Sequence, residues 1–319
     1  MNRTASYTAA STFPAKLLKN RVLDWANRIP PKHVQINPTN VCNLHCSFCS
    51  CEERDKKMAM DYFELQKMME MFRDRGCKAV TITGGGEPLL YPRINDLIRH
   101  LRYLRIQVGL VTNGTCLDKL DEDAGNKLTW ARISLSDERE VPFPVIVRAV
   151  ELMPRVDWAF SYVLSAKPFI GQMAKAVDFA NESGFTHIRI VSDMLSLENI
   201  PDMKEIRTLL ELHGIDVSKV IFQGRKHPTK GQPKCWISLL KPLVDAKGDV
   251  YPCCGTQYAL DPPDLDYGES MKMGHWTDFP ALYANQVPFD GSRCVKCYYS
   301  DYNRALELIA APIEHEEFV

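Results

Sequence analysis

The sequence predicts an α/β fold: a partial barrel of six β/α units followed by a small cysteine-rich domain at the C-terminus. Between residues 34 and 222, short apolar runs alternate with longer amphipathic segments, a pattern typical of parallel strands joined by helices. Right-handed crossovers between such strands give a doubly wound sheet or a TIM-type barrel, and six units make an incomplete barrel. Residues with unusual chemistry follow the predicted strands, so we expect them to meet at one edge of the sheet.

The predicted strands are short and rich in β-branched or aromatic residues. They are HVQIN (33–37), AVTIT (79–83), IQVGLVT (106–112), ARISLS (131–136), WAFSYVLS (158–165) and HIRIVS (187–192). The predicted helices cover residues 61–75, 92–104, 117–127, 142–153, 169–183 and 201–213. Gly76, Gly184 and Gly214 stand where the C-terminal caps of three of these helices belong.

Three regions are expected along the chain. Residues 1–33 form an N-terminal arm whose first 22 residues are basic and rich in Ser and Thr; a transit peptide is the alternative. Residues 34–222 form the barrel, and residues 223–319 form the cysteine-rich domain. The basic stretch GRKHPTKGQPK (224–234) predicts a linker between the two, and LVDAKGDVYP predicts a hairpin turning at Lys247 and Gly248.

Composition limits the class of protein. A hydrophobic content of 45% and a formal net charge of -1 predict a soluble globular protein without a general attraction for nucleic acid or anionic membranes. Apolar runs are too short to span a bilayer, and the N-terminus lacks the apolar core of a secretory signal, so we expect a cytoplasmic protein with no membrane partner. Eleven cysteines without an export signal favour metal ligation over a disulfide framework.

The stretch NVCNLHCSFCSC (40–51) directly follows the first predicted strand. Cys42, Cys46 and Cys49 form a C-x3-C-x2-C pattern, and three thiolates can hold three irons of a 4Fe-4S cluster while the fourth iron stays open to another ligand. The alternative is a structural zinc site closed by Cys51 or His45.

A second motif, TGGGEPLL, follows the second predicted strand, and Phe48 occupies the aromatic position of the cysteine motif. With these two motifs the chain resembles the radical S-adenosylmethionine (radical SAM) enzymes over residues 34 to about 222. The resemblance implies that the methionine amino and carboxylate groups of the cofactor chelate the open iron. Reductive cleavage then gives a 5′-deoxyadenosyl radical that abstracts a hydrogen atom from the substrate. A reducing partner such as flavodoxin or ferredoxin would supply the electron.

The resemblance also implies roles for individual residues around S-adenosylmethionine. Gly85 and Gly86 allow close backbone approach to the methionine amine, and Glu87 offers an acceptor for it. The other implied contacts are adenine for Phe48, ribose for Asn113, Ser134 and Ser136, and the cofactor carboxylate for Arg189. The alternatives are plain packing for Phe48, turn formation for the polar residues after the strands, and a surface ion pair for Arg189.

The remaining cysteines form a second group. Cys235, Cys253, Cys294 and Cys297 provide four thiolates, enough to close every iron of a second 4Fe-4S cluster or to bind one zinc ion. Their spacing resembles the twitch-type C-terminal domain, a shortened relative of the SPASM domain, in the four-ligand version of enzymes acting on aminoglycoside precursors; this implies one auxiliary cluster. Cys254 is left over, and as in related epimerases it could return a hydrogen atom to a substrate radical; the alternative is packing.

Several functions fit these observations. The leading hypothesis is oxidation, epimerisation or rearrangement of a sugar-like or aminocyclitol-like small molecule. The basic linker and the aromatic residues Trp236, Tyr251, Tyr258 and Trp276 suit a nucleotide or a nucleobase in DNA or RNA, for example in phage DNA hypermodification. Peptide modification is a third hypothesis, and a non-catalytic two-site zinc protein is the fourth.

Overall fold

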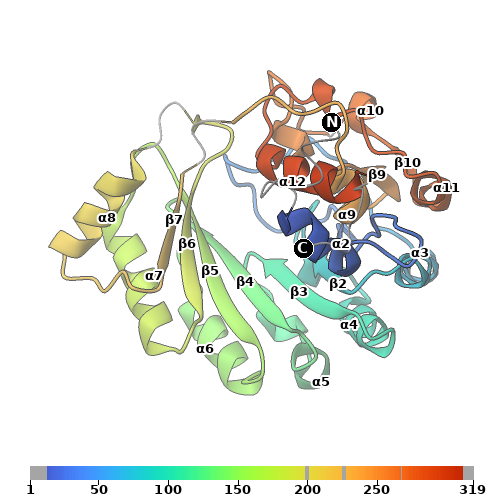
Figure 1. Cartoon of the computed structure of the whole chain (residues 1–319). Helices are drawn as coiled ribbons and strands as arrows, with labels where there is room; N and C mark the ends of the chain where they lie inside the picture. The colour runs from blue at the N-terminus through green and yellow to red at the C-terminus, as the bar shows by residue number, and fades with distance from the viewer. Residues whose placement is uncertain (1–12, 198–200, 225–227, 267, 312–319) are drawn as a thin grey trace.

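The computed structural model describes residues 13–197, 201–224, 228–266 and 268–311. One mixed sheet runs through these residues in the order β10-β9-β8-β1-β2-β3-β4-β5-β6-β7. Its strands β1 to β7 are mutually parallel, and no ladder among the described residues joins β7 back to β1, so the barrel is partial, as predicted. Helices α3 to α8 follow the strands in turn and surround the outside of the sheet (Figure 1).

The bounds of the barrel strands are β1 (His33–Ile36), β2 (Ala79–Ile82), β3 (Gln107–Thr112), β4 (Trp130–Ser136), β5 (Asp157–Leu164), β6 (His187–Ser192) and β7 (Val220–Gln223). Those of the helices are α3 (Tyr62–Asp74), α4 (Ile94–Tyr103), α5 (Glu122–Gly125), α6 (Phe143–Leu152), α7 (Ile170–Glu182) and α8 (Met203–Leu212).

Alternation along each strand explains why these segments are strands. In β4 the side chains of Ala131, Ile133 and Leu135 enter the main hydrophobic core, whereas Arg132 and Ser134 occupy the other face. The helices contribute matching apolar stripes, such as Ile94, Leu97, Ile98 and Leu101 on α4. The core therefore lies between the sheet and its outer helices, and the opposite, inner face of the sheet is free to carry polar residues.

The predicted boundaries hold within a few residues, with two exceptions. The segment 117–127 is not one helix: a 3₁₀ turn η2 (Leu117–Lys119) is followed by extended Leu120 and by α5, because Asp121 accepts a hydrogen bond from Ala124 N and starts a new helix there. Strand β7 was also not predicted. The three glycine caps adopt positive φ angles of 99°, 71° and 74° at Gly76, Gly184 and Gly214, as expected of C-terminal caps.

The C-terminal segment extends the same sheet. Strand β8 (Leu243–Val244) pairs in parallel with β1, and β9 (Asp249–Tyr251) and β10 (Gly274–His275) add antiparallel neighbours. The hairpin predicted at Lys247 and Gly248 is thus present. Around it lie α9 (Ile237–Leu240), η4 (Thr256–Tyr258), α10 (Gly268–Met271), α11 (Phe279–Ala284), η5 (Gly291–Arg293) and α12 (Ser300–Ala310). The boundary at residue 223 remains a prediction.

The first and last helices lie side by side (Figure 1). Helix α2 (Phe13–Val22) contributes Ala15 to a small apolar cluster with Leu23, Ile29, Leu239 of α9 and Ile309 of α12. This cluster fixes the two ends of the described chain against the cysteine-rich segment.

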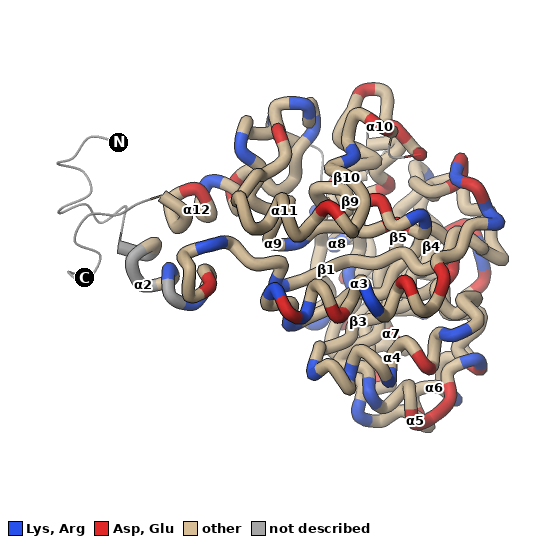
Figure 2. The backbone as a smooth tube through the Cα atoms, turned by 90° about the vertical axis from the view of Figure 1, so that its right-hand side faces the viewer, with Lys and Arg blue, Asp and Glu red and all other residues tan. Residues whose placement is uncertain are grey.

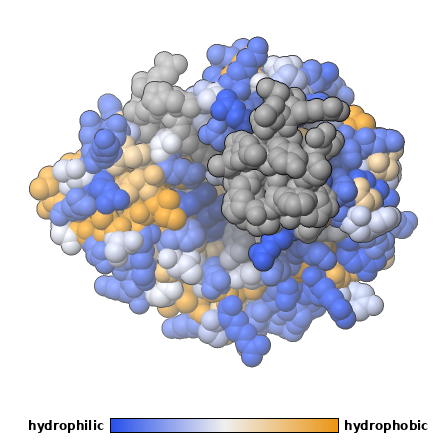
Figure 3. All heavy atoms as spheres, in the orientation of Figure 1, coloured by the Kyte–Doolittle hydropathy of each residue, from blue (hydrophilic) through white to orange (hydrophobic). Residues whose placement is uncertain are grey.

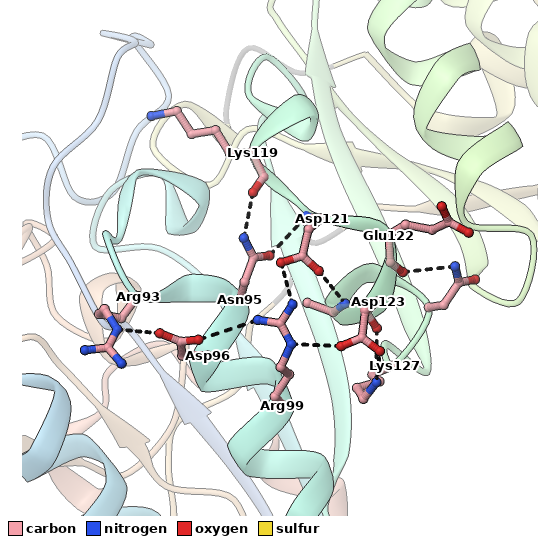
Figure 4. A network of polar contacts seen from close by, with 11 residues as sticks. Arg93, Asn95, Asp96, Arg99, Lys119, Asp121, Glu122, Asp123 and Lys127 are labelled. Atoms are coloured by element: carbon pink, nitrogen blue, oxygen red, sulfur yellow. Dashed lines mark hydrogen bonds and ion pairs between the residues drawn. The ribbon is translucent and has the colours of Figure 1, made fainter.

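Charges of both signs alternate over the surface, in keeping with a net charge of -1 (Figure 2). Exposed apolar side chains gather on one face of α8, where Leu209 and Leu212 are exposed, and hydrophilic residues line the hollow beside them (Figure 3). On the outer helices, Arg99 of α4 donates hydrogen bonds to Asp121 and Asp123 and so links α4 to α5 (Figure 4). Such exposed pairs contribute little stability each.

Candidate active site

A cavity of about 330 Å³ lies at the carboxyl ends of the first strands. Its lining brings together most of the residues predicted for the cluster and the cofactor: Cys42, Cys46, Phe48, Cys49, Gly86, Glu87, Asn113 and Ser134. Gly84, Arg139 and Tyr258 line it as well, whereas the predicted Gly85, Ser136 and Arg189 are not among its lining residues. The loop after β1, the turn after β2 and the ends of β3 and β4 supply the predicted lining residues. Residues predicted from four separate segments of the sequence therefore line one cavity.

Packing of one loop on another explains the glycines of the TGGGEP turn. A Cβ atom on Gly86 would lie 2.1 Å from the carbonyl oxygen of Val41, and one on Gly85 would lie 1.9 Å from Oδ1 of Asn40. Gly86 N donates to the Thr39 carbonyl and Glu87 N to the Val41 carbonyl, at 2.9 and 2.8 Å. Gly86 therefore admits the backbone that leads into the cysteine loop, and Gly85 admits the Asn40 side chain, a reason that the sequence did not indicate.

Glu87 is buried and already satisfied by the protein. Its carboxylate accepts hydrogen bonds from Leu89 N, Thr112 Oγ1 and Asn113 N at 3.1, 2.6 and 2.7 Å. Burial raises the pKa of Glu87, and these donors oppose the rise. Glu87 therefore joins the glycine turn to the end of β3, and any contact with a cofactor amine comes in addition to that role.

Asn113 is held in a polar network beside the cysteine loop. Its amide nitrogen donates to Asn43 Oδ1 at 2.9 Å, and its side-chain oxygen accepts from Thr115 N and Thr115 Oγ1. The C-x3-C loop is thereby tied to the end of β3 at Asn43, a contact that the sequence did not predict.

Arg139 is the functional candidate that the sequence missed. It is half-buried in the cavity, and its guanidinium donates a hydrogen bond to the Ser134 carbonyl. Burial lowers the pKa of Arg139, and the nearby Cys46, Glu87 and Cys42 oppose that shift. Gln172 of α7 fixes its segment by donating to the Ser136 and Arg139 carbonyls at 2.7 and 2.8 Å. An arginine three residues after a strand gives no sequence signal that separates it from a surface charge.

A second cavity of about 360 Å³ adjoins the first and shares Phe48 and Val163 with it. Ser136 lines this second cavity, so the two predicted serines are divided: Ser134 faces the cysteines and Ser136 faces the neighbouring space. Ser136 is 1% exposed, and its Oγ has no hydrogen-bond partner among the described residues. Buried hydroxyls usually have a hydrogen-bond partner, so Ser136 Oγ is placed to bond water or a polar group of a molecule in this cavity.

Two acidic residues order the rim of the second cavity. Asp137 accepts hydrogen bonds from Tyr162 Oη, Ser165 N, Ser165 Oγ and Phe169 N at 2.7 to 3.0 Å. Glu138 accepts from the backbone and hydroxyl of Ser47 in the cysteine loop. The loop after β4 is therefore anchored both to β5 and to the cysteine loop.

Arg189 lies deeper than predicted. It lies on the inner face of β6 and donates to Ser161 Oγ at 3.4 Å. Arg189 is not one of the described residues that line the two cavities. Arg139, and not Arg189, lies at the cysteines.

Two of the loop thiols, those of Cys46 and Cys49, lie in surroundings that oppose their ionisation. Burial raises the pKa of Cys46, and a hydrogen bond to Cys51 together with burial raises that of Cys49. A bound metal would reverse this balance, because metal ligation favours the thiolate. Cys51, the possible fourth ligand of the alternative zinc site, is buried against Cys49, and its Sγ lies 3.5 Å from the Gly84 carbonyl oxygen.

The second cysteine group converges in a small enclosed space. Cys235, Cys253, Cys294 and Cys297 all line it, and Cys253 Sγ and Cys297 Sγ each accept a backbone hydrogen bond at 3.4 Å, from Gly255 and Tyr299. Burial raises the pKa of Cys235 to about 12 and that of Cys294 to about 11. Four soft donors with backbone N–H groups on two of the sulfurs fit an iron-sulfur cluster.

Cys254 follows Cys253 directly but does not line this space. Its Sγ is 3.3 Å from the hydroxyl oxygen of Tyr299, and it packs against the small apolar cluster of Leu243, Tyr251 and Phe289.

The C-terminal segment also reaches the first cavity. Gln257 Nε2 donates to Ser50 Oγ at 2.9 Å, and Tyr258 lines the cavity beside Cys49. Of the aromatic residues singled out in the sequence, Tyr258 is the one at the cysteines. In the linker, Arg225 and Lys226 lie outside the described residues.

Two further findings concern the described part of the chain. Its His, Cys, Asp and Glu side chains form no group of three or more that could hold a single metal ion. Its helices include none with the length and apolar character needed to cross a bilayer.

Comparison with known proteins identifies a family and several relatives. The family model described as the Radical SAM superfamily matches residues 36–210, more than half of the chain. A probable GTP 3',8-cyclase of Thermoplasma volcanium is 27% identical over 187 residues, which cover 57% of this chain and 51% of that protein. The GTP 3',8-cyclase of Clostridium perfringens is 34% identical over 125 residues, covering 36% of this chain and 38% of the relative. The matches thus span about a third to a half of the curated relatives' length.

Solved structures support the fold. Streptococcus suis SuiB bound to S-adenosylmethionine superimposes with a TM-score of 0.59 at 18% identity, over 84% of this chain and 68% of SuiB. At this level of identity the similarity establishes the architecture and leaves the substrate open.

Proposed function

Because the chain belongs to the radical SAM superfamily, we propose that it removes a hydrogen atom from a sugar-bearing small molecule, leading to oxidation, epimerisation or rearrangement. As a member of that superfamily it is an enzyme that uses a 4Fe-4S cluster and S-adenosylmethionine. The observation that carries the proposal is the shared cavity in which the C-x3-C-x2-C loop, the glycine turn and Arg139 meet.

The residues present fit this cofactor pair. Cys42, Cys46 and Cys49 provide three soft donors and would leave one iron open. Arg139 is a half-buried cation in the same cavity, suited to the carboxylate of the methionine moiety. When bound, the cluster and S-adenosylmethionine supply the one-electron chemistry that removes the hydrogen atom.

The second cavity suits the adenosine half of the cofactor. Phe48, which lines both cavities, offers an aromatic face for adenine, and the unpaired Ser136 hydroxyl offers a hydrogen bond to a ribose hydroxyl. Ser134 and Asn113 remain candidates on the side of the cysteines. Glu87 and Gly86 hold the turn against the cysteine loop and so exclude water from that side of the cluster.

In the C-terminal segment, Cys235, Cys253, Cys294 and Cys297 would hold an auxiliary 4Fe-4S cluster. Cys254 is proposed as a hydrogen donor to a substrate radical, with its thiol oriented by the Tyr299 hydroxyl. Product made in deuterated water should then carry deuterium. Cys254→Ala should still cleave S-adenosylmethionine but yield little product, and an undiminished product yield would remove this role.

Two other substrate classes have support. A nucleotide is favoured by the names of the relatives, GTP 3',8-cyclases. A peptide is favoured by the similarity to SuiB bound to its precursor peptide SuiA, with a TM-score of 0.58. A sugar-bearing small molecule includes the ribose of a nucleotide, so the first alternative is compatible with the proposal.

The test starts from protein reconstituted anaerobically with iron and sulfide. The wild type should bind about eight irons per chain and form 5′-deoxyadenosine from S-adenosylmethionine and a reductant, as two clusters of four irons require. The triple variant Cys42→Ala, Cys46→Ala, Cys49→Ala should keep about four irons and form none. Cys77→Ala is the matched control, because Cys77 lies in the core between sheet and helices. Continued 5′-deoxyadenosine formation by the triple variant would overturn the proposal.

A further inference from the structure

The inner face of the partial barrel carries a group of cationic side chains that the proposed function does not use. Along β4, β5 and β6, the residues that alternate with the core-facing ones include Arg132, Ser161, His187 and Arg189. Their neighbours Ile133, Phe160, Ile188 and Ile190 belong to the core on the other side. The four polar side chains therefore share one face.

Strand register places these cations close to one another. Arg132 is level with Ala159 of β5 and through it with His187 of β6, while Arg189 is level with Ser161 and through it with Ser134. Strands two apart in a sheet are separated by about 10 Å, and the two-residue offset adds about 7 Å along the strands. The Cα atoms of Arg132 and Arg189 are therefore roughly 12 Å apart, a gap that two arginine side chains can share. The pKa of His187 is consistent with this proximity, because it is lowered first by burial and then by the charges of Arg189 and Arg132.

The same face holds buried amide groups that lack partners. On the inner side of β1, Gln35 and the following Asn37 alternate with Val34 and Ile36 of the core. Asn37 is 1% exposed and Gln35 9% exposed; neither side-chain polar atom of Asn37, nor Oε1 of Gln35, has a hydrogen-bond partner among the described residues. Buried amides usually have a hydrogen-bond partner, which at Gln35 and Asn37 would be water or a polar group of a bound molecule.

We propose that this inner face binds an oxyanion of the substrate, a phosphate or a carboxylate, between Arg132 and Arg189. Arginine suits both groups, since its planar guanidinium can donate two parallel hydrogen bonds to them. Trp130, whose ring centre lies 5.4 Å from the Arg132 guanidinium carbon, limits how that side chain can move.

The position of the site fits the chemistry above it, and here the inference rests on the proposed function. Ser134, two residues after Arg132 on the same face, lines the cavity with the cysteines, so the two Cα atoms are about 7 Å apart along the strand. The rim of the neighbouring cavity carries Asp137, Glu138 and Asp193, which would repel an anion at the mouth. The charges therefore orient the substrate with its anionic group inward and its reacting carbon toward the cofactor.

Isothermal titration calorimetry with inorganic pyrophosphate and with malonate tests this site and separates phosphate from carboxylate. Wild-type protein should bind at least one of them, and Arg132→Gln and Arg189→Gln should each weaken that binding about tenfold or more, as expected for a lost charge-assisted pair. Arg148→Gln, on the exposed face of α6, is the matched control and should change nothing. Binding of neither anion by the wild type, or wild-type affinity in both inner-face variants, would overturn the site.

A second measurement needs no variant. Pyrophosphate or malonate should protect Arg132 and Arg189 from phenylglyoxal modification, read by mass spectrometry of peptides, whereas Arg148 should react equally with and without the anion. If neither pyrophosphate nor malonate reduced the modification of Arg132 and Arg189, that result would contradict the proposal.

Iron content and cleavage of S-adenosylmethionine are measured on the same preparations. Protein that cleaves the cofactor but binds neither anion refutes the anion site alone. Protein that binds the anion but never assembles a cluster refutes the proposed function alone.

Discussion

Replacing Gly86 by alanine tests whether the glycine turn is built for contact between loops. The added Cβ would lie 2.1 Å from the Val41 carbonyl oxygen and 2.5 Å from both the carbonyl carbon and oxygen of Asn40. All three are backbone atoms, so no side chain can rotate away and the cysteine loop itself must shift. Forcing one methyl group into a packed site costs about 1–3 kcal/mol.

A shift of the loop would also weaken two hydrogen bonds, from Gly86 N to the Thr39 carbonyl and from Glu87 N to the Val41 carbonyl. At about 1 kcal/mol each, these bring the expected loss of unfolding free energy to about 3–5 kcal/mol. For a chain of this size that corresponds to a fall in melting temperature on the order of 5–10 °C.

The assay is thermal unfolding of the metal-free protein followed by circular dichroism, with iron binding as a second readout. Gly86→Ala should melt earlier and bind less iron after reconstitution, because the three thiols no longer meet. The control is Gly171→Ala in α7, where a Cβ would meet only the Phe169 ring at 3.5 Å; it should gain about 0.5–1 kcal/mol. A Gly86→Ala protein with the melting temperature and iron content of the wild type would refute the reasoning.

Three further predictions follow from buried groups. Glu87→Gln places an amide N–H₂ against donors such as Asn113 N and should lower the unfolding free energy, measured by urea titration, by about 1–3 kcal/mol. Glu122→Gln, at an exposed position, should stay within about 0.5 kcal/mol of the wild type in the same assay. Equal effects of the two substitutions would contradict the role of burial. Burial, and then the charge of Lys241, lowers the pKa of His33 to about 4. As the pH falls from about 6.5 to about 4, the unfolded chain therefore gains the proton first, and the free energy of unfolding falls by up to roughly 3 kcal/mol. His33→Gln should lose less stability over this range, and parallel curves of unfolding free energy against pH for the two proteins would argue against this reasoning. Cys235→Ala should retain about half of the wild-type iron, measured with a ferrozine assay, and full iron content would exclude Cys235 as a ligand.

Local patterns were sufficient to predict most of the barrel. Strands β1 to β6 alternate apolar and polar residues or run apolar for several positions, and that signal resides within each segment. Strand β7 has only four residues, with Ile221 exposed, so its pattern is weak. Strand β8 is shorter still, and its pairing with β1 joins Leu243 to Gln35 across most of the chain, a contact that no local pattern reveals.

The candidate site divides in the same way. The cysteine motif and the glycine turn were predictable because each lies within one short loop, where its residue spacing can be read directly from the sequence. Arg139, Asn43 and Tyr258 were not, because each reaches the cavity through the fold: Arg139 from a loop ordered by Gln172, Asn43 through Asn113, and Tyr258 from a segment about two hundred residues away. Arg189 shows the converse, since its position on β6 was predicted while the residue lines neither of the two cavities.

The pairing of β8 with β1 has a mechanical consequence. Strand β1 leads into the loop of Cys42, and β8 leads through the hairpin to Cys253, so a shared backbone ladder spaces the two cysteine groups. If both groups hold clusters, this ladder sets the distance between them when the chain folds.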